Sequence, residues 1–177
     1  MGADEGGLTR SQRMRLDELA ARLVLGYGFY PEVVVGLAAQ LVAEGIDGDG
    51  LVQLASQPAD STKLDGVEVE SLFRSAFAEL GLEMPSREPA GWTIARLIAT
   101  AIVEGEIPPA TGAHRLWSLS GECGHPAELV EMLDLHEMWE SSVEPERTAA
   151  EAEILAFAPE VVAAAGRHLA AQWPSKS

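Results

Sequence analysis

The chain has 177 residues and a formal net charge of −16, from 28 acidic and 12 basic side chains. Nucleic-acid binding depends on a cationic face that displaces counterions from phosphates, and no segment of this chain supplies one, which argues against direct binding of DNA or RNA. The single cysteine, Cys123, cannot form an intramolecular disulfide and fits a reducing compartment.

The beginning of the chain lacks the pattern of a targeting peptide. Residues 1–8 are acidic and glycine-rich, and we expect them to be disordered. They contain no basic stretch followed by an apolar run, as a secretory signal would. The longest uncharged apolar run, 33–43, is too short to span a membrane. We therefore expect a cytoplasmic protein that does not contact a membrane.

A first helical unit is predicted over residues 9–81. Thr9 or Ser11 can cap a helix that runs to about Leu25, where Gly26 and Gly28 end it.

Pro31 is placed like the first residue of the next helix, which should continue to Glu44. No charge occurs from Val33 to Ala43, so this helix should be buried on most sides. The valine triplet at 33–35 could instead form a strand, but the run is long and has no pairing partner.

Two more helices complete the first unit. Asp47 or Asp49 is expected to cap a short helix to about Ser56, followed by a polar loop over 57–66. Asp65 can cap a helix over 67–80, whose apolar side chains recur at helical spacing. A connector over 82–90 contains Pro85 and Pro89.

The pattern of residues 34–45 recurs at 94–105. The two segments read VVGLAAQLVAEG and IARLIATAIVEG, with four identities, and each is followed by a second helical segment, a polar loop and a third helix. The sequence therefore predicts two related three-helix units.

The second unit is predicted over residues 91–142. A helix over 91–104 is followed by one that starts at Pro108-Pro109 and runs to about Ser118. Pro126 should open a third helix to about Ser142, with an apolar face made of Leu129, Met132, Leu133, His136, Trp139 and Val143.

The tail, 143–177, reads as an alanine-rich helical extension with a break near Ala158, because the residue before Pro159 resists the α conformation. We thus expect an all-α bundle of about 7–9 helices that forms one compact domain.

The segment GIDGDGLVQLAS resembles part of a calcium-binding loop. Asp47, Asp49 and Gly50 fall at its third, fifth and sixth positions, but Gly45 and Ser56 stand where the first and last carboxylates belong. A capped turn between helices is the simpler interpretation.

Three histidines and the cysteine lie close together in the sequence. His114, Cys123, His125 and His136 are ligand types that zinc prefers, but their spacing matches no zinc-finger pattern. Because His136 lies on an apolar helix face, we expect it in the core, without a metal. Cys123 and His125 could also be a nucleophile and its base, although no orienting acid is identifiable. We expect no cofactor.

The second unit carries a tryptophan in each predicted helix, at positions 92, 117 and 139. The simpler interpretation is an aromatic core; the alternative is a pocket between helices lined by His114, Trp117 and His136.

Acidic residues gather in the last third of the chain. Residues 121–160 hold eleven acids and one base. Five of the acids recur along the predicted helix at 126–142: Glu128, Glu131, Asp134, Glu137 and Glu140. They form either a solvated face or a docking face for a basic partner.

The stretch IARLIATAIVEGEIPPATGAHRLW resembles a pattern in small uncharacterised helical proteins of actinobacteria, over about residues 90–157. The resemblance implies an all-helical fold and supplies no catalytic residues.

These observations favour a non-catalytic, acidic protein-binding module, such as an immunity or antitoxin-type protein or a regulatory adaptor, that acts on a basic partner. The alternative is a small-molecule- or metal-binding protein, or an enzyme of this kind, that uses the pocket near His114, Trp117 and His136.

Overall fold

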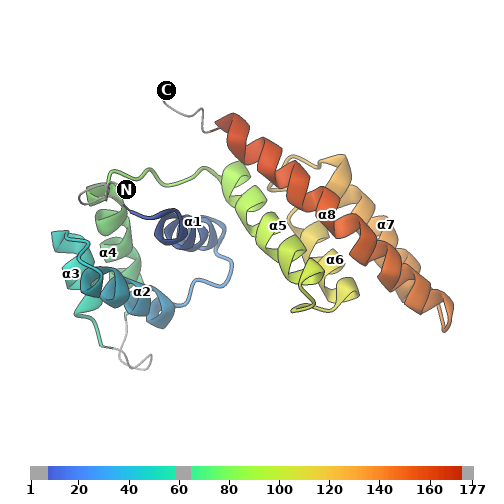
Figure 1. The fold of residues 1–177 in the computed structure, drawn as a ribbon, viewed down its shortest axis with the longest axis horizontal. Helices are drawn as coiled ribbons and strands as arrows, with labels where there is room; N and C mark the ends of the chain where they lie inside the picture. The colour runs from blue at the N-terminus through green and yellow to red at the C-terminus, as the bar shows by residue number, and fades with distance from the viewer. Residues whose placement is uncertain (1–7, 59–64, 173–177) are drawn as a thin grey trace, which may run out of the picture. The chain divides into compact units, whose positions relative to one another are not determined.

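The computed structural model describes residues 8–58 and 65–172, and all regular elements in these ranges are helices (Figure 1). They are α1 (Arg10–Leu25), α2 (Pro31–Ala43), α3 (Asp49–Ala55), α4 (Gly66–Glu79), α5 (Arg87–Val103), α6 (Pro109–Ser118), α7 (Ala127–Ser141) and α8 (Glu146–Gln172). The expected all-α class is confirmed. The chain divides into two compact units, Met1–Pro85 and Ser86–Ser177.

In the first unit, α1 is capped at both ends by local sequence. The Thr9 hydroxyl accepts from the Gln12 backbone N–H, and the Gln12 side chain accepts from Thr9, which forms a capping box. Gly26 ends the helix in the left-handed conformation, with φ 66°. Of the two expected caps, Thr9 is the one used.

The segment after Pro31 is a helix and not a strand, as predicted. Its buried side chains, Val34, Val35, Leu37, Ala38 and Leu41, all lie on one side. Val33 is 52% exposed, and Gly36 and Gln40 are exposed as well. The expectation of burial on most sides is therefore wrong, because a lack of charge does not require a second covering layer.

The cap of α3 comes from a distant residue. Neither Asp47 nor Asp49 caps this helix: its N-cap is Gly48, and a Glu79 carboxylate oxygen from α4 accepts from the Gly50 N–H at 2.8 Å. A carboxylate near a helix N-terminus accepts a hydrogen bond from a free N–H and interacts favourably with the positive end of the helix dipole. Asp65 caps α4 as expected, because its side chain accepts hydrogen bonds from the backbone N–H groups of Val67 and Glu68.

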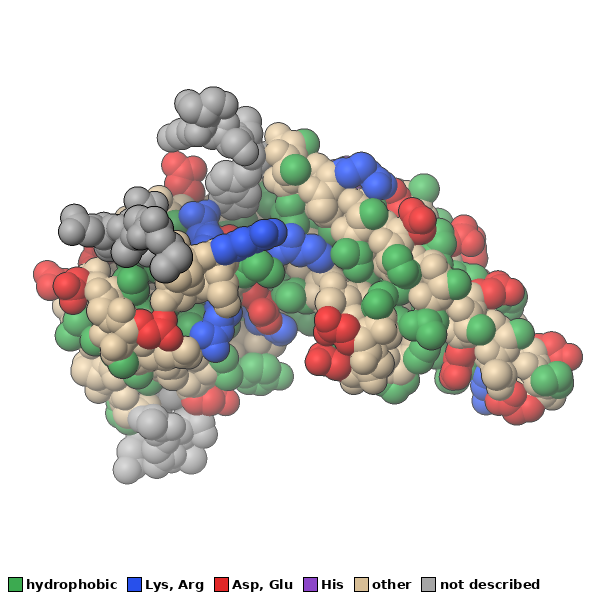
Figure 2. All heavy atoms as spheres, viewed as in Figure 1, with side chains coloured by type: hydrophobic (Ala, Val, Ile, Leu, Met, Phe, Trp, Pro, Cys, Tyr) green, Lys and Arg blue, Asp and Glu red, His purple; other side chains and the backbone are tan. Residues whose placement is uncertain are grey.

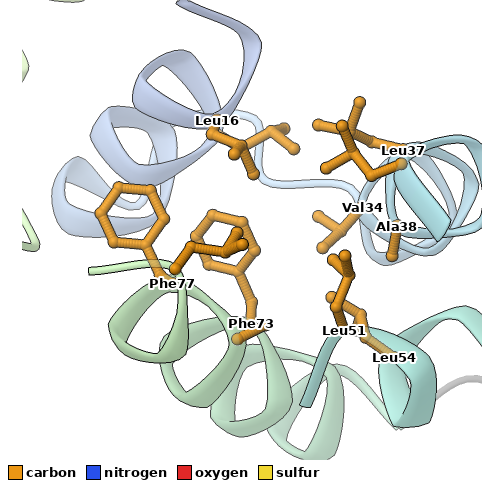
Figure 3. Close-up of a pocket in the computed structure, with 12 residues that line it drawn as sticks. Leu16, Val34, Leu37, Ala38, Leu51, Leu54, Phe73 and Phe77 are labelled. Atoms are coloured by element: carbon orange, nitrogen blue, oxygen red, sulfur yellow. The ribbon is translucent and has the colours of Figure 1, made fainter. Parts of the chain in front are cut away.

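The core of the first unit gathers apolar side chains from all four helices, which point toward one another in Figure 3. Phe73 lies 6.0 Å from Phe29 and 5.5 Å from Phe77 between ring centroids. The void left between these side chains has a volume of about 10 Å³, room for one water molecule. This space belongs to the packing of the core and does not accommodate a ligand.

In the second unit, α5 starts at Arg87, earlier than the expected start at 91. Pro89 occupies the third position of the helix. A backbone N–H at this position would have no intrahelical acceptor, so proline costs no hydrogen bond there. α6 starts at Pro109 and α7 follows the N-cap Pro126, both as predicted.

The predicted break near Ala158 is wrong, because α8 continues through Pro159. The carbonyl deprived of its hydrogen bond belongs to Leu155, which is 44% exposed, and Pro159 is exposed on the same side. Water can therefore reach this carbonyl, while fully buried side chains such as Ile154 and Val161 hold the other side of the helix in the core.

By length and composition α8 is also apolar enough, over Glu146–Ala171, to cross a membrane. A core helix of a soluble protein passes the same test.

The two segments that suggested an internal repeat lie in different units, on α2 and α5. The duplication stays a prediction.

Candidate functional site

The candidate site is built on α7, which packs through Leu129, Met132, Leu135 and His136. The burial of His136, 8% exposed, confirms its expected place in the core. Val143 is 73% exposed, so its assignment to the apolar face is wrong. The helix ends at Ser141, and the helical spacing that led to Val143 does not continue beyond it.

The structure divides the five acids of the expected docking face. Glu131, Asp134 and Glu137 are exposed, and among the described residues no cation pairs with them. Glu128 is half-buried and accepts from the Arg167 guanidinium of α8 at 3.3 Å. Glu140 is exposed, with a carboxylate oxygen 3.6 Å from His136 Nε2.

Two apolar side chains stand among these three exposed acids. Val130 and Met138 are each 37% exposed, and with Asp134 they occupy one row at i, i+4 and i+8. We call Val130, Glu131, Asp134, Glu137 and Met138 the outer face of α7. Figure 2 shows acidic and apolar side chains interspersed over α7 and the start of α8. The face therefore offers negative charge together with apolar contact area.

Of the expected pocket residues, the structure brings two together. The His114 and His136 rings are 5.0 Å apart between centroids, although the first is exposed and the second buried. His136 Nδ1 is buried and has no hydrogen-bond partner among the described residues. Trp117 is half-buried on α6, one helical turn after His114.

Trp139 joins the end of α7 to the start of α8. Its ring is stacked on His136 with centroids 5.9 Å apart, and its indole N–H donates to Glu151 at 3.0 Å. The Arg147 guanidinium lies 4.7 Å from the centroid of the same ring. The third tryptophan of the predicted set, Trp92, is fully buried, so two of the three contribute to packing rather than to an open pocket.

The residues considered as metal ligands do not assemble. Cys123 is buried in the loop after α6, whereas His125 in the same loop is exposed. Within residues 8–58 and 65–172, no group of three or more His, Cys, Asp or Glu side chains is placed to hold a metal ion, and this includes Asp47 and Asp49.

Cys123 is held as a neutral thiol. Burial, and to a smaller extent the charges of Glu88 and Glu122, raises the pKa of this thiol from 9.0 to about 12. Gly91 of α5 lies against it, so closely that a Cβ there would stand 2.8 Å from Sγ. These surroundings oppose the thiolate that a nucleophile needs.

We expect Cys123 in the folded protein to be alkylated by iodoacetamide far more slowly than in urea, because a shift of this size lowers the thiolate population on the order of a thousandfold. Mass spectrometry of timed samples measures the rate, and the urea-unfolded chain is the control. Between pH 9 and about 12 the unfolded thiol ionises and the folded one does not, so unfolding becomes easier as pH rises. Rapid labelling of the folded protein would contradict this assignment.

Sequence reasoning missed two surface hollows in the first unit. One, of about 330 Å³, lies between α1 and α2, beside Val33, Gly36 and the Arg15–Gln40 hydrogen bond. The other, of about 550 Å³, is lined by Ile46, Glu79 and their neighbours. The uncharged outer side of α2 was the only sequence signal for the first.

The chain was compared with protein-family models, with curated proteins and with solved structures, and no match was found.

Proposed function

We propose that this protein is a non-catalytic binding module whose outer face of α7 docks a basic protein partner. An immunity or antitoxin-type protein and a regulatory adaptor are the two forms this module could take. The observation that carries the proposal is the set of three exposed acids around Val130 and Met138 that have no cation partner within the described part of the chain. Acids retained only for solubility need no exposed apolar neighbours. A docking face, in contrast, gains affinity from negative charge and from apolar contact area together.

The composition of this face defines the partner chemically. Its acids are spaced at three residues along one helix, so the complementary cations should recur at a similar spacing, about 4.5 Å apart along the axis. Val130 and Met138 call for apolar side chains between those cations. A basic amphipathic helix meets both requirements. The overall charge of −16 adds long-range attraction and speeds encounter with such a partner.

A synthetic amphipathic helical peptide rich in Lys and Arg tests this proposal, with a scrambled peptide of equal charge as the comparison. We expect the amphipathic peptide to bind more tightly at low salt and to weaken as salt rises. The double variant Glu131→Lys/Asp134→Lys should slow association roughly tenfold and change dissociation less. Stopped-flow fluorescence of a labelled peptide measures both rates.

The matched control is Glu104→Lys/Glu106→Lys. Both of these acids are exposed in the same unit, and the control changes the net charge by the same amount. If the two double variants lose association rate equally, only the total charge matters and the outer face of α7 is not a docking site. Equal binding of the scrambled peptide would likewise remove the role of Val130 and Met138.

A second candidate is a small-molecule or metal site beside His114, Trp117 and His136. Two observations favour it: the contact of the two imidazoles, and a buried His136 Nδ1 without a hydrogen-bond partner in the described ranges. Stoichiometric zinc in the purified protein, lost on replacing His136 by alanine, would support this candidate over the first.

A further inference from the structure

The side of α8 that faces away from α5 and α7 carries an apolar seven-residue repeat. Alanines stand at 149, 156, 163 and 170, and three residues after the first three of them come Ala152, Pro159 and Gly166. All of these are exposed except Gly166, which is half-buried. The core side chains of α8, such as Ile154 and Val161, lie on the opposite side. A repeat at this spacing has the pattern of a coiled-coil seam, and it lies outside the core of the unit.

The two edges of this repeat differ in chemistry. One edge carries Glu153, Glu160 and Arg167, spaced seven apart. The other carries Leu155, Val162 and Leu169, of which Leu155 is 44% exposed. Along α8 in Figure 2 most side chains are apolar, with few charges between them.

The edges select an orientation for a second helix of the same sequence. A parallel pair would set the charged edge of one helix against the apolar edge of the other. An antiparallel pair sets like edges together, so that Arg167 of one copy meets Glu153 of the other and Leu155 meets Leu169. Complementary charges at such edge positions fix partner and direction in coiled coils.

We propose that α8 binds α8 of a second copy of this chain, antiparallel and about a two-fold axis. Such a contact is self-complementary, as the two edges require. The small side chains let the two helices approach closely, and Arg167, whose side chain is 65% exposed, stays accessible despite its contact with Glu128. One helix pair buries less than the roughly 1,200 Å² of a stable interface, so the dimer is weak and reversible. The two-fold axis also brings Glu160 near Glu160 of the second copy, and the repulsion between these carboxylates opposes the association.

Sedimentation velocity of the full chain, over about 10 to 500 µM, tests this contact in the range of weak complexes. We expect the apparent mass to rise with concentration toward that of two chains. Ala156→Glu should abolish the rise, because it buries a carboxylate in the seam. Ala78→Glu, at an exposed position on α4, is the matched control and should leave it unchanged. Circular dichroism verifies that both variants keep their helix content.

Charge reversal tests the orientation. Glu153→Arg should weaken the dimer several-fold, and adding Arg167→Glu should restore it, while Glu160→Gln should strengthen it. A wild-type chain that stays monomeric at every concentration overturns the proposal. So does an Ala156→Glu variant that still dimerises, or a double reversal that restores nothing. None of these variants alters the outer face of α7, so peptide binding is scored separately.

Discussion

Replacing Trp92 by alanine should lower the free energy of unfolding of the second unit by about 3–5 kcal/mol, the usual cost of emptying a fully buried aromatic site. Trp92 has no exposed surface, and its ring lies parallel to that of His168 from α8, with centroids 4.2 Å apart. Alanine would therefore leave a cavity between the helix that starts the unit and the one that ends it. Urea unfolding followed by far-UV circular dichroism measures the loss.

Trp92→Phe separates the volume of the side chain from its polar atom. The indole Nε1 is buried and has no hydrogen-bond partner among the described residues, which costs the folded state free energy. Phenylalanine removes this unpaired N–H and keeps an aromatic ring against His168, so we expect a loss of only about 1–2 kcal/mol. Equal losses in the two variants would mean that the indole volume is not what holds these helices together.

The helix boundaries that the sequence predicted correctly depend on adjacent residues. Thr9 and Asp65 cap the helices that they precede, and Pro31, Pro109 and Pro126 stand at helix starts. Each signal acts within about one helical turn, so it is visible without the fold.

The misplaced features all depend on contacts between distant segments. Glu79 replaces Asp49 as the stabiliser of the α3 start, from 29 residues beyond Gly50. The continuity of α8 through Pro159 follows from which side of the helix is packed, and that is set by the other helices of the unit. The local conformational preference before Pro159 predicts a break in the helix, but it contains no information on the packing that keeps the helix continuous.

For the candidate site, too, the sequence predicted what local helical spacing determines and missed the contacts between distant segments. The acid spacing on α7 placed Glu131, Asp134 and Glu137 on one exposed side, as a helix requires. Glu128 precedes them by one turn and was expected to join them, yet it pairs with Arg167, 39 residues away. Sequence also suggested that His114 approaches His136, but it could not show that the His136 ring also stacks on Trp139.

Two glycine-to-alanine substitutions should change stability in opposite directions. In α3, a Cβ on Gly50 would stand 2.9 Å from the backbone nitrogen of Ala76 and 3.1 Å from its Cα. Backbone atoms of α4 cannot move aside as the end of a side chain can, so α3 would be displaced from α4 and from Glu79. We expect Gly50→Ala to lower the free energy of unfolding of the first unit by about 1–3 kcal/mol.

Gly36→Ala is the matched control, in an exposed position within α2 where a Cβ would have no atom within 4 Å. There alanine restricts the unfolded chain and favours the helix, so the same change should raise the free energy of unfolding by about 0.4–1 kcal/mol. Urea unfolding of the two variants beside the wild type gives both values. Since the chemical change is identical, opposite signs assign the loss at Gly50 to the close approach of α3 and α4. A gain at both positions would show that the two helices have room to separate.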